Sequence, residues 1–138
     1  MPGPYVISDL SLLTTLPGKD AVVPASDQGY GVQCVGLVKY YSSCGATAVW
    51  KEGDLVGESP GLARGTAIAT FDDTGKYRSA ASGNHACFFI SFMPSNTGIT
   101  VLEQHVWPDP NKIQTRNIIY RGGRGDPSND ANAYSVIL

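Results

Sequence analysis

With 138 residues, of which 42% are hydrophobic, 16 are glycine and 9 are proline, the chain has the composition of one domain built from short elements and many turns. Ten basic and twelve acidic residues give a net charge of −2. Because they are scattered without blocks, we expect no binding to nucleic acid or to a membrane surface through charge. No apolar stretch is long enough to span a membrane. Because the chain is long enough for one core but too short for two, residues 1–138 are predicted to form a single domain.

The N-terminal segment does not have the pattern of a signal peptide. No lysine or arginine precedes Lys19, and polar residues interrupt the apolar pieces. Ser8 or Asp9 is instead a candidate cap for a short packing helix. The apolar side of this helix would consist of four leucines, Leu10, Leu12, Leu13 and Leu16. A turn-rich loop over residues 24–31 then leads to the next element.

A second helix is predicted to begin at Cys34. Leu37, Val38 and Tyr41 follow the cysteine at the i+3, i+4 and i+7 positions, which places an apolar stripe on the cysteine face. Unpaired backbone N–H groups and the helix dipole at this end favour the thiolate, which lowers the cysteine pKa and makes Cys34 a candidate nucleophile. A lone cysteine in a helix is more often a small core residue, so this interpretation needs a base nearby.

The three cysteines, Cys34, Cys44 and Cys87, form an odd set. One disulfide with a free thiol and three reduced thiols are both compatible with this number. If a bridge forms in an oxidising compartment, we expect it between Cys44 and Cys87, with Cys34 left free. The C-x-x-C and H-x-x-x-H spacings of a zinc site are absent from the sequence, so no metal site is predicted.

The second half of the chain has the pattern of β-strands, with runs of apolar and β-branched residues between turn signals. Five segments are predicted as strands: 66–71, 84–92, 99–107, 114–120 and 133–138. The second and third of these would form a hairpin. Helices first and strands second predict an α+β fold, with N-terminal helices packed on an antiparallel β-sheet.

Two histidines, His85 and His105, are the candidate bases for the cysteine. In the predicted hairpin His85 lies across from His105, and strand alternation presents Glu103 on the same face as His85. A shift of one residue in the register would present Gln104 instead. A strand histidine is more often structural, yet a nucleophile on a helix, a base on a strand and an acceptor on the next strand would form a Cys–His–acid site. His85 is the preferred base.

Several blocks of the sequence, taken together, carry a family resemblance. Three of them are Gln33-Cys34 at a helix start, Gly83-Asn84-His85-Ala86 at a strand start, and residues 99–104 in the next strand. In order and spacing these resemble the CHAP-type, papain-like peptidoglycan amidases. More narrowly, residues 65–71 and the closing segment 121–127 resemble the second family of type VI secretion amidase effectors. The similarity covers about residues 29–138 and implies a papain-like, CHAP-like fold.

The resemblance implies a role for each matching residue. Cys34 would attack an amide carbonyl, and His85 would activate it and then protonate the leaving amine. Glu103 would hold the imidazole in its orientation, and Gln33 with the Cys34 backbone N–H would lie near the developing oxyanion. The sequence departs from the pattern at His105, where CHAP relatives often carry asparagine, so His105 or Gln104 could compete for the orienting role.

A substrate groove is predicted around these residues. Four aromatic residues are candidates to line it for a peptide stem, although each is more often core or rim packing: Tyr30, Trp50, Tyr77 and Trp107. The polar loop over residues 72–83 and the segment 108–115 adjoin the predicted site and are expected to form its walls.

The resemblance implies a cysteine amidase or endopeptidase that cleaves the peptide part of bacterial peptidoglycan through a thioester, with no metal or organic cofactor. The crosslink between D-alanine and diaminopimelate is the favoured bond. The resemblance also implies an interbacterial toxin, stored in the cytoplasm of the producer, moved by a secretion system into the periplasm of a rival and countered by an immunity protein.

Two other classes of function remain open from the sequence. One is a non-catalytic wall-binding or adhesion module, for which the tripeptide Arg124-Gly125-Asp126 is a weak signal. The other is a cysteine transferase or deamidase that acts on a protein substrate. The first makes no use of Cys34, and the second shares the Cys–His pair and differs in substrate.

Overall fold

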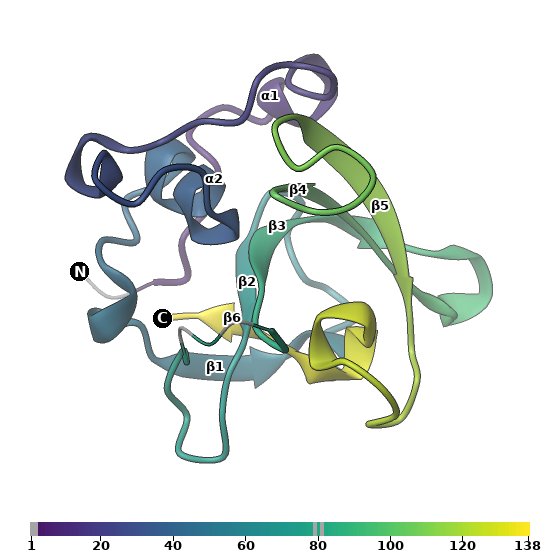
Figure 1. Cartoon of the computed structure of the whole chain (residues 1–138). Coiled ribbons are helices and arrows are strands. Elements are labelled where there is room, and N and C mark those ends of the chain that lie inside the picture. Colours follow the sequence, from purple (N-terminus) through teal and green to yellow (C-terminus); the bar gives the residue numbers. More distant parts are fainter. Residues whose placement is uncertain (1–2, 79, 81) are drawn as a thin grey trace.

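Figure 1 shows the computed structural model of the chain, which describes residues 3–78, 80 and 82–138. The strands of this part are β1 (Glu52–Leu55), β2 (Ala67–Thr70), β3 (Ala86–Phe92), β4 (Gly98–Gln104), β5 (Ile113–Ile119) and β6 (Tyr134–Ile137). They form one antiparallel sheet in the order β1-β6-β2-β3-β4-β5. Within the described ranges, no helix is both long and apolar enough to cross a membrane.

The helices lie mainly in the N-terminal third, as the sequence predicts. The α-helices are α1 (Leu12–Thr15) and α2 (Cys34–Tyr41). Short 3-10 turns connect the other elements: η1 (Ala25–Asp27), η2 (Thr47–Val49), η3 (Val56–Glu58), η4 (Pro94–Asn96), η5 (Pro127–Asn129) and η6 (Ala131–Ala133). The α+β architecture, with helices packed on an antiparallel sheet, is therefore confirmed.

Helix α2 begins at Cys34 as predicted, because the preceding residue Gln33 has extended backbone angles and the chain turns helical after it. Leu37 and Val38 are completely buried, and the helix packs against β3 and β4. Gly36 permits this close approach, because a Cβ atom there would lie 3.0 Å from both the Gln104 amide nitrogen and a backbone oxygen.

Helix α1 is shorter and starts later than predicted. Asp9 caps a turn ahead of the helix, where its Oδ1 accepts a hydrogen bond of 2.9 Å from the Ser11 N–H. Of the leucines expected on the apolar side, Leu13 and Leu16 are buried, whereas Leu10 is exposed. The helix therefore has a packing role, as predicted, with a narrower apolar face.

The five predicted strands are all present, and two differences are informative. Strand β1 was not expected, because Glu52, Gly53 and Asp54 have low strand propensity; it is an edge strand that pairs with β6 alone. The strand predicted to reach residue 107 ends at Gln104. His105 has a φ of 64°, which takes the backbone out of the extended conformation.

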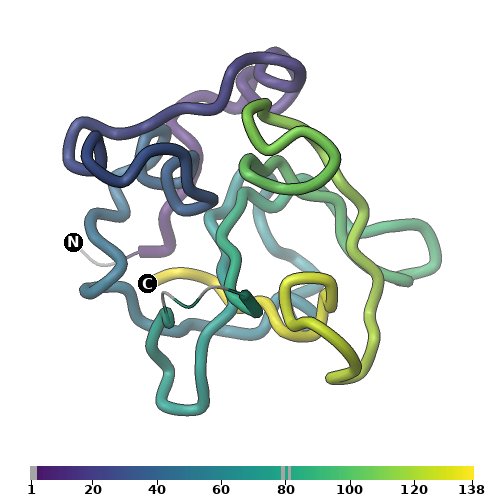
Figure 2. The backbone as a smooth tube through the Cα atoms, viewed as in Figure 1, coloured from purple at the N-terminus to yellow at the C-terminus, as the bar shows by residue number. Residues whose placement is uncertain are grey.

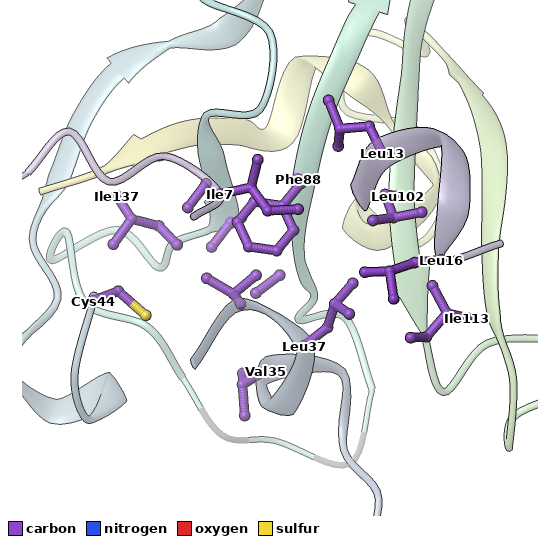
Figure 3. Close-up of a cluster of buried hydrophobic side chains, with 14 of the residues drawn as sticks. Ile7, Leu13, Leu16, Val35, Leu37, Cys44, Phe88, Leu102, Ile113 and Ile137 are labelled. Carbon is purple, nitrogen blue, oxygen red and sulfur yellow. The ribbon is translucent and has the colours of Figure 1, made fainter. Parts of the chain in front are cut away.

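The β3–β4 register at the end of the sheet near His85 is the one expected from the sequence. Phe88 pairs with Leu102 and Phe89 with Val101, and an irregularity follows toward the hairpin turn. Side chains alternate between two core clusters, with Phe88 and Leu102 in the cluster that α2 covers and Phe89 and Val101 in the other. Figure 3 shows the first cluster, where Phe88 and Leu102 face Leu37 of α2.

The expected Cys44–Cys87 disulfide is not formed. Both residues are buried free thiols, and they belong to different core clusters, Cys44 to the one under α2 and Cys87 to the other. Burial raises the pKa of each thiol, which keeps both protonated. Cys34 is therefore the cysteine whose thiol pKa is lowered.

Candidate active site

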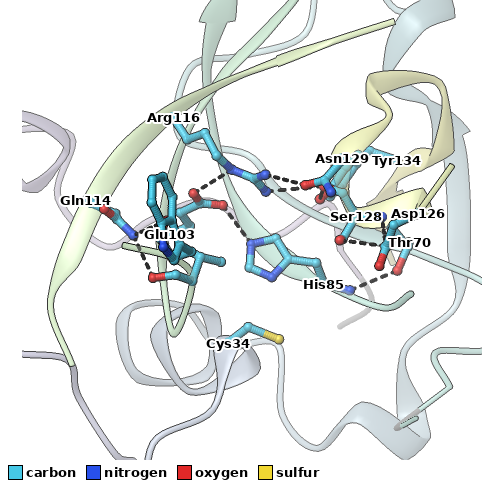
Figure 4. A network of polar contacts seen from close by, with 12 residues as sticks. Cys34, Thr70, His85, Glu103, Gln114, Arg116, Asp126, Ser128, Asn129 and Tyr134 are labelled. Atoms are coloured by element: carbon cyan, nitrogen blue, oxygen red, sulfur yellow. Dashed lines mark hydrogen bonds and ion pairs between the residues drawn. The ribbon is translucent and has the colours of Figure 1, made fainter. Parts of the chain in front are cut away.

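A cleft of about 410 Å³ opens where the N-terminus of α2 meets the beginning of β3. Its lining comes from four segments: the start of α2, the polar loop that precedes β3, the turn after β4 and the segment around η5. Cys34 and His85 both line it, and Figure 4 shows the His85 ring between the Glu103 carboxylate and the Cys34 side chain. The predicted nucleophile, base and acid thus come together at one place.

Cys34 is half-buried at the first residue of α2. Its Sγ lies 3.5 Å from the Tyr77 hydroxyl oxygen. Burial raises the pKa of the thiol, but hydrogen bonding to His85 and the His85 charge, together with Tyr77 and the backbone of Ala86, more than offset this effect. The net result is a pKa below the ordinary value of a cysteine, as a nucleophile requires.

His85 is buried just ahead of β3 and is fixed at both its backbone and its ring. Its N–H donates to Thr70 Oγ1 at 3.0 Å, and its Nε2 lies 2.8 Å from Glu103 Oε1. Burial alone would lower the pKa of the imidazole, but interactions with Cys34 and Glu103 raise it to about 9. A lowered cysteine pKa beside a raised histidine pKa favours a thiolate–imidazolium pair.

Glu103 has no solvent exposure and uses both carboxylate oxygens. Oε1 faces His85, and Oε2 accepts a hydrogen bond of 2.7 Å from Arg116 Nε. The other Arg116 nitrogens donate to Asn129 Oδ1 at 2.7 Å and to the Ser128 carbonyl at 3.2 Å. The buried carboxylate is therefore balanced by two cationic partners.

Arg116 is not among the site residues predicted from the sequence, although β5 carries a signal for it. Arg116 is the one charged residue of β5, and it pairs across the strands with Val101, two residues from Glu103. In an antiparallel pair this places Arg116 and Glu103 diagonally on the same face. A charge in an otherwise uncharged strand next to a predicted catalytic acid would have indicated the partner.

Gln104 lies away from the cleft, because strand alternation turns it to the face that α2 covers. Its Nε2 donates to the carbonyls of Val22 at 2.8 Å and Gln33 at 2.7 Å, and its Oε1 accepts from the Val22 N–H at 2.8 Å. Gln104 thus holds the backbone just before Cys34 and does not line the cleft.

The remaining predicted site residues do not all reach the cleft. Gln33 and His105 line the cleft, but His105 is exposed and lies beyond the end of β4 instead of on the strand. Tyr30 is exposed and is not among the lining residues. The tripeptide Arg124-Gly125-Asp126 also lies on exposed chain, with Asp126 at the edge of the cleft.

The walls of the cleft agree with the predictions in part. The polar loop before β3 contributes Tyr77, Ala80, Ser82 and Gly83, as expected; residues 79 and 81 of this predicted wall lie outside the described residues. The segment 108–115 does not line the cleft, and Asp126 and Ser128 stand in its place. In the described part of the chain, no group of three His, Cys, Asp or Glu residues is placed to hold a metal ion.

Comparison with known proteins gives the same answer at the levels of family, sequence and structure. The family model described as "Domesticated amidase effector 2" matches residues 17–137. The type VI secretion amidase effector 2 protein of Salmonella typhi is 34% identical over 116 residues, which span 76% of this chain and 84% of the relative. A solved structure of type 6 secretion amidase effector 2 superposes with a TM-score of 0.74 and 30% identity, covering 98% of this chain and 94% of the other.

The structural match extends over nearly the whole chain and confirms the papain-like α+β fold expected from the sequence. The range matched by the family model, residues 17–137, includes Cys34, His85 and Glu103. The chain therefore belongs to the amidase effector 2 family.

Proposed function

We propose that this protein is a cysteine amidase that hydrolyses a peptide amide of bacterial peptidoglycan and acts as a toxin delivered by a type VI secretion system. Membership of the amidase effector 2 family supports the substrate and the route. The single observation that carries the chemistry is the arrangement of Cys34, His85 and Glu103. His85 Nε2 lies 2.8 Å from Glu103 Oε1, and the imidazole lies beside a cysteine of lowered pKa.

In the proposed mechanism, the Cys34 thiolate attacks the amide carbon and forms a C–S bond while the carbonyl oxygen takes up the negative charge. The Cys34 backbone N–H and the Gln33 side chain stabilise this oxyanion. The imidazolium of His85 gives its proton to the departing amine, and a thioester remains. His85 then removes a proton from water, whose oxygen attacks the thioester carbon. The C–S bond breaks, the acid is released, and the Cys34 thiolate and the His85 imidazolium are restored. Glu103 keeps the imidazole in position throughout.

We favour the crosslink between D-alanine of one stem peptide and diaminopimelate of the next as the scissile bond. The family relationship supports this choice over an amide within one stem. The chemistry does not distinguish the two amides, so selection falls to the cleft walls, which are the loop before β3 and the segment around η5.

Digestion of purified sacculi tests both the enzyme and the bond. The protein should convert dimeric muropeptides into intact monomers and leave purified monomers unchanged. Cys34→Ala, His85→Ala and the double variant should retain their fold and fall to a similar low residual rate, because groups that act as a unit are not additive. Parental activity in Cys34→Ala would exclude the mechanism, and cleavage of monomeric stems would move the bond to within one stem.

The proposed delivery route predicts where the protein is harmful. Synthesis in the cytoplasm of a test bacterium should be tolerated, whereas the same chain directed to the periplasm should cause lysis, and Cys34→Ala should remove this effect. A producer cell also needs protection, so we propose a cognate immunity protein that closes the cleft. Lysis by the periplasmic Cys34→Ala variant would contradict a toxic role based on hydrolysis.

A further inference from the structure

Tyr77 approaches the nucleophile from the loop that precedes β3. Its hydroxyl oxygen lies 3.5 Å from Cys34 Sγ, and either atom could be the donor in this contact. The direction matters, because a hydroxyl that donates stabilises a thiolate, whereas a hydroxyl that accepts favours the protonated thiol. The surroundings of the phenol decide between the two.

Asn84 orients the Tyr77 hydroxyl by donating a hydrogen bond to its oxygen. The backbone N–H of Ala80 can only donate, and it donates to Asn84 Oδ1 at 3.2 Å. This turns the amide nitrogen toward the phenol, and Asn84 Nδ2 donates to the Tyr77 oxygen at 3.1 Å. The oxygen accepts from Asn84, and the sulfur has no proton to donate once the Cys34 proton has gone to His85, so the hydroxyl proton is directed to the sulfur.

The ring of Tyr77 is also held in place from its other side. Trp50 packs against it edge to face, with ring centroids 5.1 Å apart. The buried Trp50 is itself anchored, because its indole N–H donates to the carbonyls of Cys44 at 3.1 Å and Gly45 at 3.2 Å. Burial and the nearby Cys34 raise the pKa of Tyr77, so the phenol keeps the proton that it donates.

We propose that Tyr77 is a catalytic residue that donates a directed hydrogen bond to Cys34 and holds the sulfur as a thiolate before attack. The chain of donors runs from the Ala80 N–H through Asn84 and Tyr77 to the sulfur. The proton of Cys34 itself goes to His85, so Tyr77 transfers none. This inference rests on the proposed function in taking Cys34 as the nucleophile.

Several other charged or titratable groups lie around Cys34, on α2 and on the elements that border the cleft. His85 contributes from the start of β3 and is backed by Glu103 on β4. His105 after β4 and Asp126 before η5 border the same cleft. On α2 itself, Lys39 is paired with Asp27 at 2.6 Å. Tyr77 and His85 are the side chains whose hydrogen bonds lower the pKa of Cys34, against the effect of burial.

The test is the rate at which iodoacetamide alkylates Cys34 in the full chain, followed by mass spectrometry of the Cys34 peptide from about pH 5 to about pH 10. In Tyr77→Phe we expect the rate at the acid end of the profile to fall about 10-fold, because loss of the donor raises the pKa of Cys34. At high pH the two proteins should react alike, since the sulfur is then ionised in both. Tyr40→Phe, at an exposed tyrosine of α2, should match the parent.

Asn84→Ala provides a second, independent arm. Without Asn84 the Tyr77 hydroxyl can rotate, so the alkylation rate at the acid end of the profile should fall by about 3-fold. In the double variant, Asn84→Ala should cause no further loss of rate beyond that of Tyr77→Phe. An unshifted profile in Tyr77→Phe would overturn the inference. So would an effect of Asn84→Ala on the alkylation rate that persists in a protein already carrying Tyr77→Phe. Alkylation needs no peptidoglycan, so this result is separate from the outcome of sacculus digestion.

Discussion

Glu103 and Gln104 are neighbours on β4, but strand alternation sends their side chains to opposite faces of the sheet. Glu103 contacts the His85 ring, whereas the Gln104 side chain bonds the backbone of Val22 and Gln33. We expect Glu103→Gln to lower kcat/KM by roughly 10²–10⁴-fold, because an amide cannot balance the imidazolium charge. Gln104→Ala should cost less activity and act mainly through stability. A larger loss of kcat/KM in Gln104→Ala would contradict this assignment.

The raised pKa of His85 predicts how the protein responds to alkaline pH. Burial opposes the shift, but Cys34 and Glu103 raise the pKa from 6.5 to about 9. The imidazolium therefore contributes stability that is fully present below about pH 6.5 and is lost as the pH rises through about 9. The lowered pKa of Cys34 has the opposite linkage and offsets this loss of stability. We therefore expect kcat/KM to fall as the pH rises through about 9, because the imidazolium that protonates the leaving amine is lost, while the free energy of unfolding changes little.

Cys34→Ala is the matched variant for the pH experiment, because it removes one of the two groups that raise the pKa of His85. In this variant the opposing contribution of the thiolate is gone and Glu103 still raises the pKa of His85, so an alkaline fall in the free energy of unfolding should emerge, as measured by urea unfolding at a series of pH values. An unchanged alkaline limb would mean that His85 and Cys34 are not electrostatically coupled.

At the scale of elements, Arg116 joins β5 to the segment around η5. Its fork of donors serves Glu103, Asn129 and the Ser128 carbonyl at once, and lysine cannot reproduce that geometry. Arg116→Lys should lower the free energy of unfolding by about 1–3 kcal/mol and reduce activity as well. Arg124→Lys, at an exposed position, should change stability by less than about 0.5 kcal/mol. Equal effects of the two changes in thermal unfolding would contradict the bridging role.

Gly36 tests how tightly α2 sits on the sheet. Alanine is the better helix former by about 1 kcal/mol, but its Cβ would meet Gln104 and the Val22 carbonyl at 3.0 Å. Overpacking of this kind costs about 1–3 kcal/mol, so Gly36→Ala should be destabilising on balance. Gly61→Ala, with no atom within 4 Å of the added Cβ, is the control for chemical denaturation. A stabilised Gly36→Ala protein would show that the helix can move away from β4.

The sequence predicts those elements whose signal is local. The Cys34 helix and the strand that follows His85 show their apolar patterns directly in the sequence. The hairpin register follows from the number of residues between the two predicted strands. The predicted end of the strand was wrong because the residues after Gln104 keep a strand-like composition. The left-handed backbone of His105, which ends the strand, has no signal in that composition. Strand β1 was missed because its polar residues form a strand only when β6 provides the partner.

The least predictable part of the site is the contribution of distant segments. Asn129 and Ser128 reach Glu103 only through Arg116, and neither has a sequence pattern that connects it to a histidine far upstream. Tyr77 was predicted only as a groove aromatic. Its place beside the sulfur depends on Asn84 and Trp50, which the fold brings together from separate loops.

At the scale of the whole molecule, β6 lies between β1 and β2, so Thr70 pairs with Tyr134. Figure 2 shows the yellow C-terminal strand alongside the segment of β1. Tyr134 packs edge to face on His85, and its hydroxyl donates to the Ser128 carbonyl. On the ribosome, β1 and β2 emerge well before β6, so the nascent chain at first lacks both the strand that joins them and the tyrosine that packs on His85. Translation itself therefore delays the assembly of the hydrolase until β6 has left the exit tunnel.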